Sequence, residues 1–310
     1  MIGFLGEALI DLVAAKEGET SLFYNHIGGC ALNAAVSAAR LEADVIYMGK
    51  ISADFFGKEI EKYFKENRVD LFEPFVGVKE PTMLAFAHLD ASKAASYTFY
   101  TKGTTIDSLS SDEIVNLLNT FDDIHYLHVG SVSLALENSG NEILKALKSL
   151  NERPFIFFDP NVREAVIENH TSYLKRVLEV AKLANMIKLS DEDIRLLFPL
   201  LKTEEAVGQL LDLGVDHIVL TMGKEGLKWF SQDNLVVSVK AYGEKVVDTI
   251  GAGDTVSGAL LSYLSENAIG PTDPLEEEEI KEALTLASKA AAVTVSRAGA
   301  NPPYYNELSF

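Results

Sequence analysis

Cysteine is almost absent from this 310-residue sequence, and so are the marks of an exported or membrane-bound chain. The single cysteine, Cys30, excludes an internal disulfide and suits a reducing compartment. No apolar stretch approaches the length that is needed to cross a bilayer. The opening residues, MIGFLGEALIDL, have neither the basic start nor the small-residue cleavage site of a signal peptide. We therefore expect a cytoplasmic protein.

Basic residues are also scarce. The chain has 27 lysines and arginines against 46 aspartates and glutamates, which gives a formal charge of −19. Such a surface repels DNA, RNA and anionic lipid, so we expect no nucleic acid and no membrane as a partner. A nucleotide would be repelled as well. A nucleotide site here would need backbone amides, a few lysines and a divalent cation.

Two common phosphate-binding loops are missing. The sequence has no Walker A motif, and no GxGxxG follows its first apolar run, which argues against a dinucleotide oxidoreductase. Internal repeats, low-complexity tracts and recognisable linkers are missing too. We therefore predict one domain over residues 1–310.

The chain does contain a regular alternation of short apolar runs and longer amphipathic ones. Buried strands are predicted at residues 2–6, 44–48, 124–129, 155–159, 186–190 and 217–221. Helices are predicted at residues 31–41, 57–68, 137–150, 172–184, 203–214, 252–266 and about 276–296. This alternation indicates an α/β fold with a doubly wound, mostly parallel sheet that is flanked by helices.

Two regions break the alternation. Residues 10–25 and 82–101 contain short segments of alternating polarity without a helix between them. They predict a small antiparallel sheet, and an extra sheet on such a domain suits a lid over a site. We place this β-sheet lid at about residues 10–25 and 82–105.

The most informative stretch is VVDTIGAGD at residues 246–254, directly before a helical pattern. Glycines at a helix start let the backbone approach a ligand, and we expect positive φ in this turn, at Gly253 for example. The free N–H groups of Gly251, Ala252 and Gly253 would form an anion site. Asp254 would then accept a proton from an attacking hydroxyl. The alternative is that an aspartate only caps the helix.

The motif DTIGAGD resembles the DTxGAGD signature of the PfkB carbohydrate kinases, which share the ribokinase fold. The resemblance extends over essentially the whole chain. It implies that the chain is an ATP-dependent kinase of a small sugar. It also implies that Asp254 is the catalytic base and that Gly251, Ala252 and Gly253 form the anion hole.

Several further positions match the sugar-binding motifs of that family. Gly28, Gly29 and Asn33 match GGxxxN, although a plain glycine turn would look the same. GEALID, which ends at Asp11, and DPNVR, which ends at Arg163, resemble bacterial fructokinases in particular. Aromatic residues at 97–100 resemble the strand that covers the sugar, and Phe99 is assigned to this contact. Fructokinases often carry arginine where this chain has Thr101.

The resemblance also implies a nucleotide site and metal ions. Residues 188–193, KLSDED, correspond to the family's NxxE region but carry Ser190 and Asp193 at its asparagine and glutamate positions. Mg²⁺ is assigned near Asp193, whose side chain is one methylene shorter than glutamate, with Glu192 or water to fill the gap and Ser190 as a helix cap. A monovalent cation, K⁺, is assigned near Asp248. The ATP-binding residues that the resemblance implies are Lys188, Ser190, Thr221, Gly223, Gly226, Ala252, Gly253, Ala287 and Asn301. Plain helix packing is an equally good explanation for Ala287.

We therefore expect a fructokinase that forms fructose 6-phosphate and ADP, with homodimerisation through the lid. The alternative substrates are 2-keto-3-deoxygluconate and other sugars or nucleosides of the family. Arg163 could pair with the carboxylate of a keto acid in a bidentate fork. An alternative of a different class is a sugar-binding regulator without catalysis. The intact Asp254 and its glycine turn argue against that alternative.

Overall fold

The computed structural model describes residues 1–17, 20–89, 95–243 and 245–308. Its main element is a nine-stranded sheet with the order β15-β14-β13-β12-β11-β10-β1-β4-β6. The seven strands from β6 to β13 in this order are parallel, and β14 and β15 are antiparallel. The bounds are Ile2–Leu5 (β1), Val45–Tyr47 (β4), Asp70–Leu71 (β6), Tyr126–Gly130 (β10), Phe155–Asp159 (β11), Met186–Ser190 (β12), His217–Thr221 (β13), Leu227–Ser231 (β14) and Val236–Val239 (β15).

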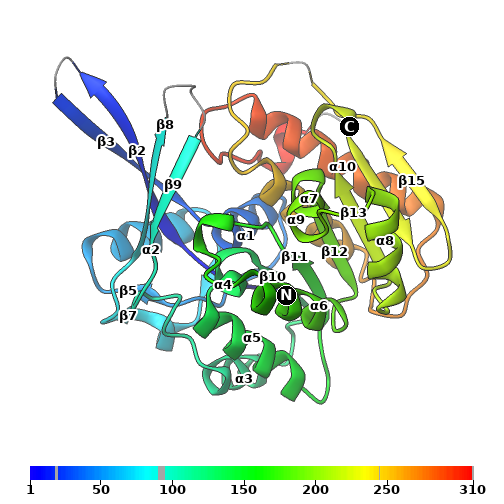
Figure 1. The fold of residues 1–310 in the computed structure, drawn as a ribbon, viewed down its shortest axis with the longest axis horizontal. Coiled ribbons are helices and arrows are strands. Elements are labelled where there is room, and N and C mark those ends of the chain that lie inside the picture. The colour runs from blue at the N-terminus through cyan, green and yellow to red at the C-terminus, as the bar shows by residue number, and fades with distance from the viewer. Residues whose placement is uncertain (18–19, 90–94, 244, 309–310) are drawn as a thin grey trace.

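Helices cover both faces of this sheet (Figure 1). One face packs against α1 (Cys30–Arg40), α2 (Phe55–Glu66), α9 (Ala252–Glu266) and α10 (Glu277–Val295). The other packs against α3 (Ser111–Thr120), α4 (Ser131–Ala135), α5 (Glu137–Ser149), α6 (His170–Ala181), α7 (Asp191–Leu197) and α8 (Thr203–Asp212). The α/β fold is therefore confirmed.

The strands are apolar throughout because both of their faces are buried. In β11, Phe155 and Phe157 pack on the α9 face, while Ile156 and Phe158 pack on the opposite face. The only tryptophan, Trp229 in β14, is completely buried. Its indole N–H lies 3.1 Å from Oγ of Ser231 and 3.3 Å from Nδ1 of His217.

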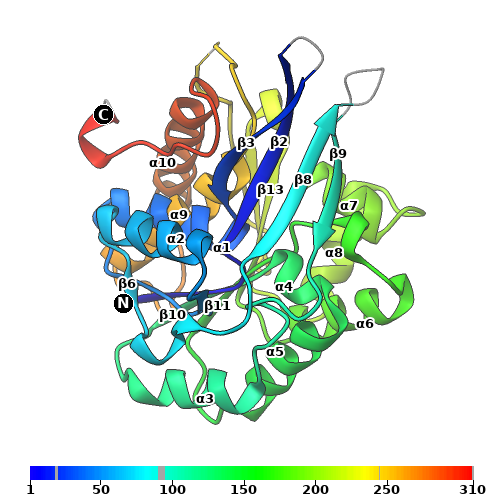
Figure 2. The same cartoon turned by 90° about the vertical axis from the view of Figure 1, so that its left-hand side faces the viewer.

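A second sheet projects beyond the main body (Figure 2). Its strand order is β3-β2-β8-β9, with bounds Thr20–Gly28 (β3), Leu9–Glu17 (β2), Met83–Leu89 (β8) and Ala95–Tyr100 (β9). We call it the small sheet. The prediction of a purely antiparallel sheet is wrong, because β2 and β8 pair in parallel and join two antiparallel hairpins. Strands β5 (Ile51–Ser52) and β7 (Val76–Val78) form a separate pair.

The topology directs ligands to one edge of the main sheet. Strand β1 lies between β4 and β10, so the chain reverses its direction of winding there. In open α/β sheets, ligands bind at the carboxyl ends of the strands near such a switch. The small sheet continues from the carboxyl end of β1. Within the described ranges, no helix has the length and apolar character that are needed to cross a membrane.

Candidate active site

Asp254 lies in the first turn of α9, where the glycine turn leads into the helix. Gly251 is the residue before the helix and has φ +76°, and its carbonyl accepts hydrogen bonds from N and Oγ1 of Thr255, both at 2.8 Å. Positive φ in this turn therefore belongs to Gly251. The expectation for Gly253 is wrong, because its φ is not in the left-handed region. Glycine is needed at 251 also because a Cβ there would lie 2.5 Å from Cβ of Ala300.

The carboxylate of Asp254 is held by two amides from distant segments. Nδ2 of Asn33 in α1 donates to Oδ2 at 2.8 Å, and Nδ2 of Asn161 donates to Oδ1 at 3.1 Å. Only 7% of Asp254 is exposed, and this burial raises the pKa of its carboxyl. The bond from Asn33 and the charge of Lys188 act in the opposite direction. A carboxylate with raised pKa is a better proton acceptor near neutral pH.

Asn161 is a site residue that the sequence interpretation did not single out. It follows the carboxyl end of β11 and has φ +38°, a left-handed conformation that asparagine tolerates better than most residues. The DPN sequence at a strand end was the available signal. Pro160 and Asn161 turn the chain back so that the amide reaches Asp254.

A buried ion pair lies below the glycine turn. Nζ of Lys188 at β12 lies 2.8 Å from Oδ2 of Asp159 at β11, and both side chains are at most 3% exposed. Ser257 of α9 donates to the same Oδ2 at 2.9 Å, and Lys188 donates to the carbonyl of Gly253 at 3.4 Å. Burial of an isolated charge costs free energy, and the pairing of Lys188 with Asp159 offsets part of this cost. The pair thus ties two strand ends to the start of α9.

Cys30, His128 and Asp159 form a buried group whose potential ligand atoms lie within 4.8 Å of one another. Burial lowers the pKa of His128 to about 3, so its ring is neutral, and burial raises the pKa of the Cys30 thiol. The ammonium of Lys188 already contacts Asp159 and would repel a metal cation. We therefore assign no metal to this group.

The predicted sugar residues Asp11, Gly28, Gly29 and Asn33 meet at the base of the small sheet. Asp11 lies in β2, and a Cβ at position 28 would lie 2.6 Å from its Oδ2, so the carboxylate approaches the backbone of Gly28 closely. Gly29 precedes α1, and Asn33 lies in the first turn of that helix. The pKa of Asp11 is raised to about 6, mainly by burial and to a smaller extent by the charge of Asp254, while His26 and Arg163 act in the opposite direction.

Arg163 is exposed and follows the turn of Pro160 and Asn161 after β11. Its charge acts on the carboxyls of both Asp11 and Asp254, so all three share one electrostatic neighbourhood. In β9, Phe99 is half-buried and packs on the main core. Tyr97 lies on the same face of β9, at 6.0 Å between ring centroids. Burial and the charge of Asp11 raise the pKa of Tyr97. Tyr97 shares a face of the small sheet with Asp11, and this position makes it a further candidate for the sugar contact.

The predicted nucleotide residues lie at the carboxyl ends of β12 and β13. Ser190 and Thr221 are register partners on these two strands. Gly223 is exposed in the turn after β13, and Gly226 is buried at the end of that turn. Thr221, Gly223 and Gly226 therefore border the same edge of the sheet as Lys188.

Asp193 has a structural role in this fold. Its Oδ2 accepts from N and Oγ of Ser190 at 2.8 and 2.6 Å, and its Oδ1 accepts from N of Val162 at 2.7 Å. Ser190 caps α7 in return, as predicted. Both oxygens are thus used, and only 5% of the residue is exposed. These bonds do not favour Asp193 as a direct Mg²⁺ ligand, whereas Glu192 in the same turn is exposed.

Two residues assigned to the adenine region have other partners. Ala287 of α10 is fully buried in the core that α9 and α10 share with the main sheet, which favours helix packing over a ligand contact. Oδ1 of Asn301 accepts a hydrogen bond from Nη1 of Arg40 at 2.7 Å.

Asp248 connects the glycine turn to the segment after α10. Its Oδ1 accepts from N of Ile250 at 3.0 Å, and its Oδ2 accepts from N of Gly299 at 2.9 Å. The carboxylate therefore holds two loops together at the place where the monovalent cation was assigned.

Comparisons with known proteins agree with this arrangement. The model of the family described as pfkB family carbohydrate kinase matches residues 1–306. Fructokinase of Rhizobium leguminosarum bv. trifolii is 31% identical over 267 residues, which cover 85% of this chain and 79% of that protein.

Two solved structures share the fold over nearly their whole length. An uncharacterized sugar kinase from Pyrococcus horikoshii, in complex with ATP, has a TM-score of 0.81 and 26% identity, and the match covers 99% of this chain and 97% of that one. A double mutant of fructokinase from Vibrio cholerae O395, with bound fructose, ADP and potassium ion, has a TM-score of 0.82 and 25% identity, with 96% and 93% covered.

Proposed function

Because this chain belongs to the pfkB family of carbohydrate kinases, we propose that it is an ATP-dependent fructokinase, which converts D-fructose and ATP to fructose 6-phosphate and ADP. The observation that carries the proposal is the position of Asp254. Its buried carboxylate, oriented by Asn33 and Asn161, lies at the start of α9 beside a glycine turn. The fructokinases among the relatives support the choice of sugar.

In the proposed reaction, Asp254 accepts the proton of the sugar hydroxyl. The hydroxyl oxygen forms a bond to the γ-phosphorus while the bond from phosphorus to the ADP oxygen breaks. The N–H groups of Gly251, Ala252 and Gly253, at the positive end of the α9 dipole, are assigned to the charge on the transferring group. The N–H of Ala252 donates to the carbonyl of Thr249 at 3.3 Å in the structure, and the transferring group would replace this long bond. Catalysis thus depends mainly on position and electrostatics.

Asp11, Asn33 and the backbone at Gly28 and Gly29 are assigned to the sugar hydroxyls. The ionised Asp11 offers two acceptor oxygens, and Arg163 and Tyr97 or Phe99 border the same space. The small sheet then acts as the lid that excludes water from the reaction. The nucleotide is assigned to the edge formed by Lys188, Ser190, Thr221, Gly223 and Gly226.

We assign two ions on the same basis. Mg²⁺ would accompany the phosphates of ATP and neutralise their charge, and Glu192 is the exposed carboxylate of the α7 turn that remains free to assist. K⁺ would bind in the region of Asp248, where the two loops meet. A location in the cytoplasm and the absence of nucleic-acid and membrane partners remain our expectation from the sequence.

A homodimer through the small sheet is also part of the proposal. The face opposite Asp11 carries a row of rings: Phe23 contacts Phe86 at 5.4 Å between centroids, and Phe86 contacts Tyr100 at 5.4 Å. Phe23 is 51% exposed and Tyr100 is 60% exposed. Exposed apolar rows of this kind are typical of contact surfaces.

The decisive test is a comparison of kcat/KM for D-fructose, ribose and 2-keto-3-deoxygluconate with ATP and Mg²⁺. We expect fructose to be preferred. An Arg163→Met variant distinguishes the main alternative, because a keto acid paired with Arg163 would lose most of its kcat/KM and fructose much less. A preference for 2-keto-3-deoxygluconate would overturn the fructose assignment, and phosphorylation of no sugar would favour the regulator.

A further inference from the structure

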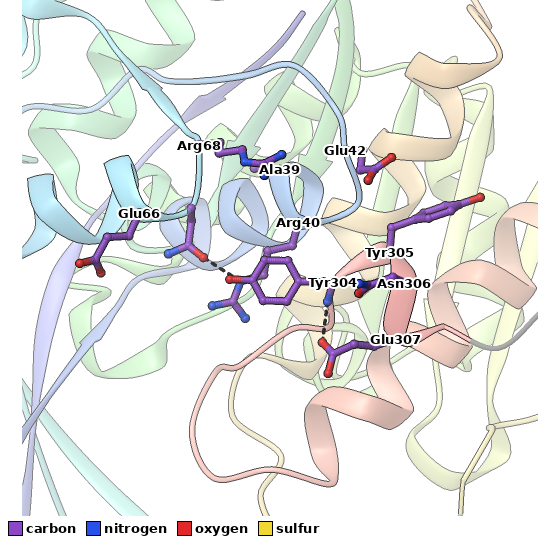
Figure 3. A pocket seen from close by; sticks show the side chains of 10 residues that line it. Ala39, Arg40, Glu42, Glu66, Arg68, Tyr304, Tyr305, Asn306 and Glu307 are labelled. Atoms are coloured by element: carbon purple, nitrogen blue, oxygen red, sulfur yellow. Dashed lines mark hydrogen bonds between the residues drawn. The ribbon is translucent and has the colours of Figure 1, made fainter.

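Arg40, the last residue of α1, lies at the opposite end of this helix from Asn33. Its guanidinium makes three short hydrogen bonds. Nε donates to Oδ1 of Asn67 at 2.7 Å, and Nη1 donates to Oδ1 of Asn301 at 2.7 Å and to the carbonyl of Pro302 at 2.6 Å. The group also lies 4.7 Å from the centre of the Tyr304 ring (Figure 3).

Asn67, which binds Nε of Arg40, is itself held in place. Asn67 is 6% exposed, and its Nδ2 donates to the carbonyl of Tyr63 at 2.8 Å. Its Oδ1 is thereby fixed toward the guanidinium. Arg40 therefore joins the end of α2 to the segment that follows α10.

That segment reaches the glycine turn within two residues. Ala300, next to Asn301, packs so closely on Gly251 that a Cβ on the glycine would lie 2.5 Å from Cβ of Ala300. Gly299 donates its N–H to Oδ2 of Asp248 at 2.9 Å. Residues 299–302 are thus fixed to the glycine turn at one end and to Arg40 at the other.

The cavity beside Arg40, about 280 Å³ in volume, does not suit an anionic ligand. It is lined by three carboxylates, Glu42, Glu66 and Glu307, and by two arginines, Arg40 and Arg68. The Nε and Nη1 donors of Arg40 already have partners within the protein. The contacts of Arg40 therefore indicate a role in holding the chain.

We propose that Arg40 is a positioning residue for the nucleotide half of the active site, acting through Asn301 and Pro302 on the Gly299–Ala300 turn that packs on Gly251. This proposal rests on the proposed kinase function. Without Arg40, the turn loses its outer support and the amides of residues 251–253 are held less firmly. None of the hydrogen bonds of Arg40 reaches Asp11 or Asn33, so the sugar half should change much less.

The test compares Arg40→Met with wild type in steady-state kinetics and in ADP binding by calorimetry. We expect KM for ATP and Kd for ADP to rise roughly fivefold to tenfold, the effect of losing charge-assisted hydrogen bonds. KM for fructose should stay within about twofold of wild type. Arg40→Lys, which can still donate to Pro302, should recover part of the loss.

Arg68→Met is the matched control, because Arg68 lines the same cavity, whereas the hydrogen bonds of residues 299, 301 and 302 are made with Arg40 and Asp248. It should leave all constants unchanged. Asn301→Ala, which removes one of the contacts, should shift Kd for ADP in the same direction by a smaller factor, and it serves if Arg40→Met does not fold. Unchanged ADP affinity in a folded variant, or an equal rise of both KM values with a lower Tm, would overturn the proposal. Calorimetry tests it even if fructose is not the substrate.

Discussion

The carboxylate of Asp254 is buried, and in the proposed reaction it takes the proton of the sugar hydroxyl. Burial raises the pKa of this carboxyl, while the hydrogen bond from Asn33 and the charge of Lys188 lower it. The ionised form is therefore disfavoured by the fold. A neutral isostere at this position should be tolerated structurally.

We expect Asp254→Asn to fold, with two opposing effects on its Tm. The cost of a buried carboxylate is removed, but one of the two amide donors, Asn33 or Asn161, then faces an NH2 group and loses its acceptor. Its kcat should fall by about 10² to 10⁴, the usual contribution of a general base. The check is a coupled assay together with thermal unfolding and sugar binding. A folded variant with wild-type kcat would show that another group takes the proton.

Asp11 permits a prediction about pH, because burial raises its pKa from 3.8 to about 6. A carboxyl with raised pKa in the folded state stabilises the fold below its unfolded pKa, and this contribution is lost as the pH rises through about 6. Sugar binding should follow the opposite course, because the ionised group accepts hydroxyls better. KM for fructose should thus rise by up to roughly tenfold per pH unit below 6.

Asp11→Asn provides the control for this pH dependence. The part of the change in Tm between about pH 4 and about pH 7 that wild type shows and the variant lacks belongs to Asp11. The variant's KM for fructose should be higher and should no longer depend on pH in this range. If Tm and KM of the two proteins depend on pH in the same way, Asp11 does not titrate between about pH 4 and about pH 7.

At the scale of the elements, the glycine turn before α9 contains glycines with different tasks. Gly251 is in the left-handed region and packs on Ala300, whereas a Cβ on Gly253 would meet only Nζ of Lys188, at 3.1 Å. The first position demands glycine for conformation and space. At position 253, a side chain would require only a small shift of the Lys188 ammonium group.

We therefore expect Gly251→Ala to lower the stability by more than about 1–2 kcal/mol, since the left-handed conformation and the contact with Ala300 both oppose a side chain. Gly253→Ala should cost less. Urea unfolding of the two variants measures the difference. Equal stability losses would mean that the Ala300 segment moves away without cost.

The sequence was sufficient for the elements whose signal is local. The main strands and the long helices were predicted within a few residues, because continuous apolar runs and helical periodicity depend only on neighbours. The parallel pairing of β2 with β8 was missed, since the alternation in each hairpin does not specify which hairpin lies beside it. Strand β14 was missed because its burial alternates along the strand, whereas β11, a predicted strand of equal length, is continuously buried.

The site shows the same division. DTIGAGD and Asn33 were found from motifs in the sequence, and the structure brings them together. Other contacts join residues that are 29 to 261 positions apart in the sequence. They are the pair of Lys188 with Asp159 and the hydrogen bonds from Asn161 to Asp254 and from Arg40 to Asn301. A local pattern such as DPN can point to a residue, but it does not specify a partner so far away in the sequence, so these contacts required the fold.

At the scale of the whole molecule, the exposed ring row of the small sheet predicts assembly. Wild type should elute at about twice the chain mass of 33.9 kDa. The double variant Phe23→Asp with Tyr100→Asp should elute as a monomer, because charges replace exposed apolar surface on both outer strands. Sedimentation or light scattering gives the mass directly.

The control for assembly is Phe55→Asp on α2, which alters another exposed phenylalanine, 68% accessible, outside the small sheet. It should remain a dimer. A dimeric double variant, or a monomeric wild type at micromolar concentration, would place the contact elsewhere or remove it.

The buried Trp229 gives the molecule a built-in optical probe. It is the sole tryptophan, and it lies in β14, one strand from the sheet edge that is remote from β4 and β6. Its indole N–H contacts His217 and Ser231, which belong to β13 and β14 at this end of the main sheet. Its emission will therefore follow the melting of the antiparallel edge and stay constant when a sugar is added. Closure of the small sheet will need a dye placed on that sheet.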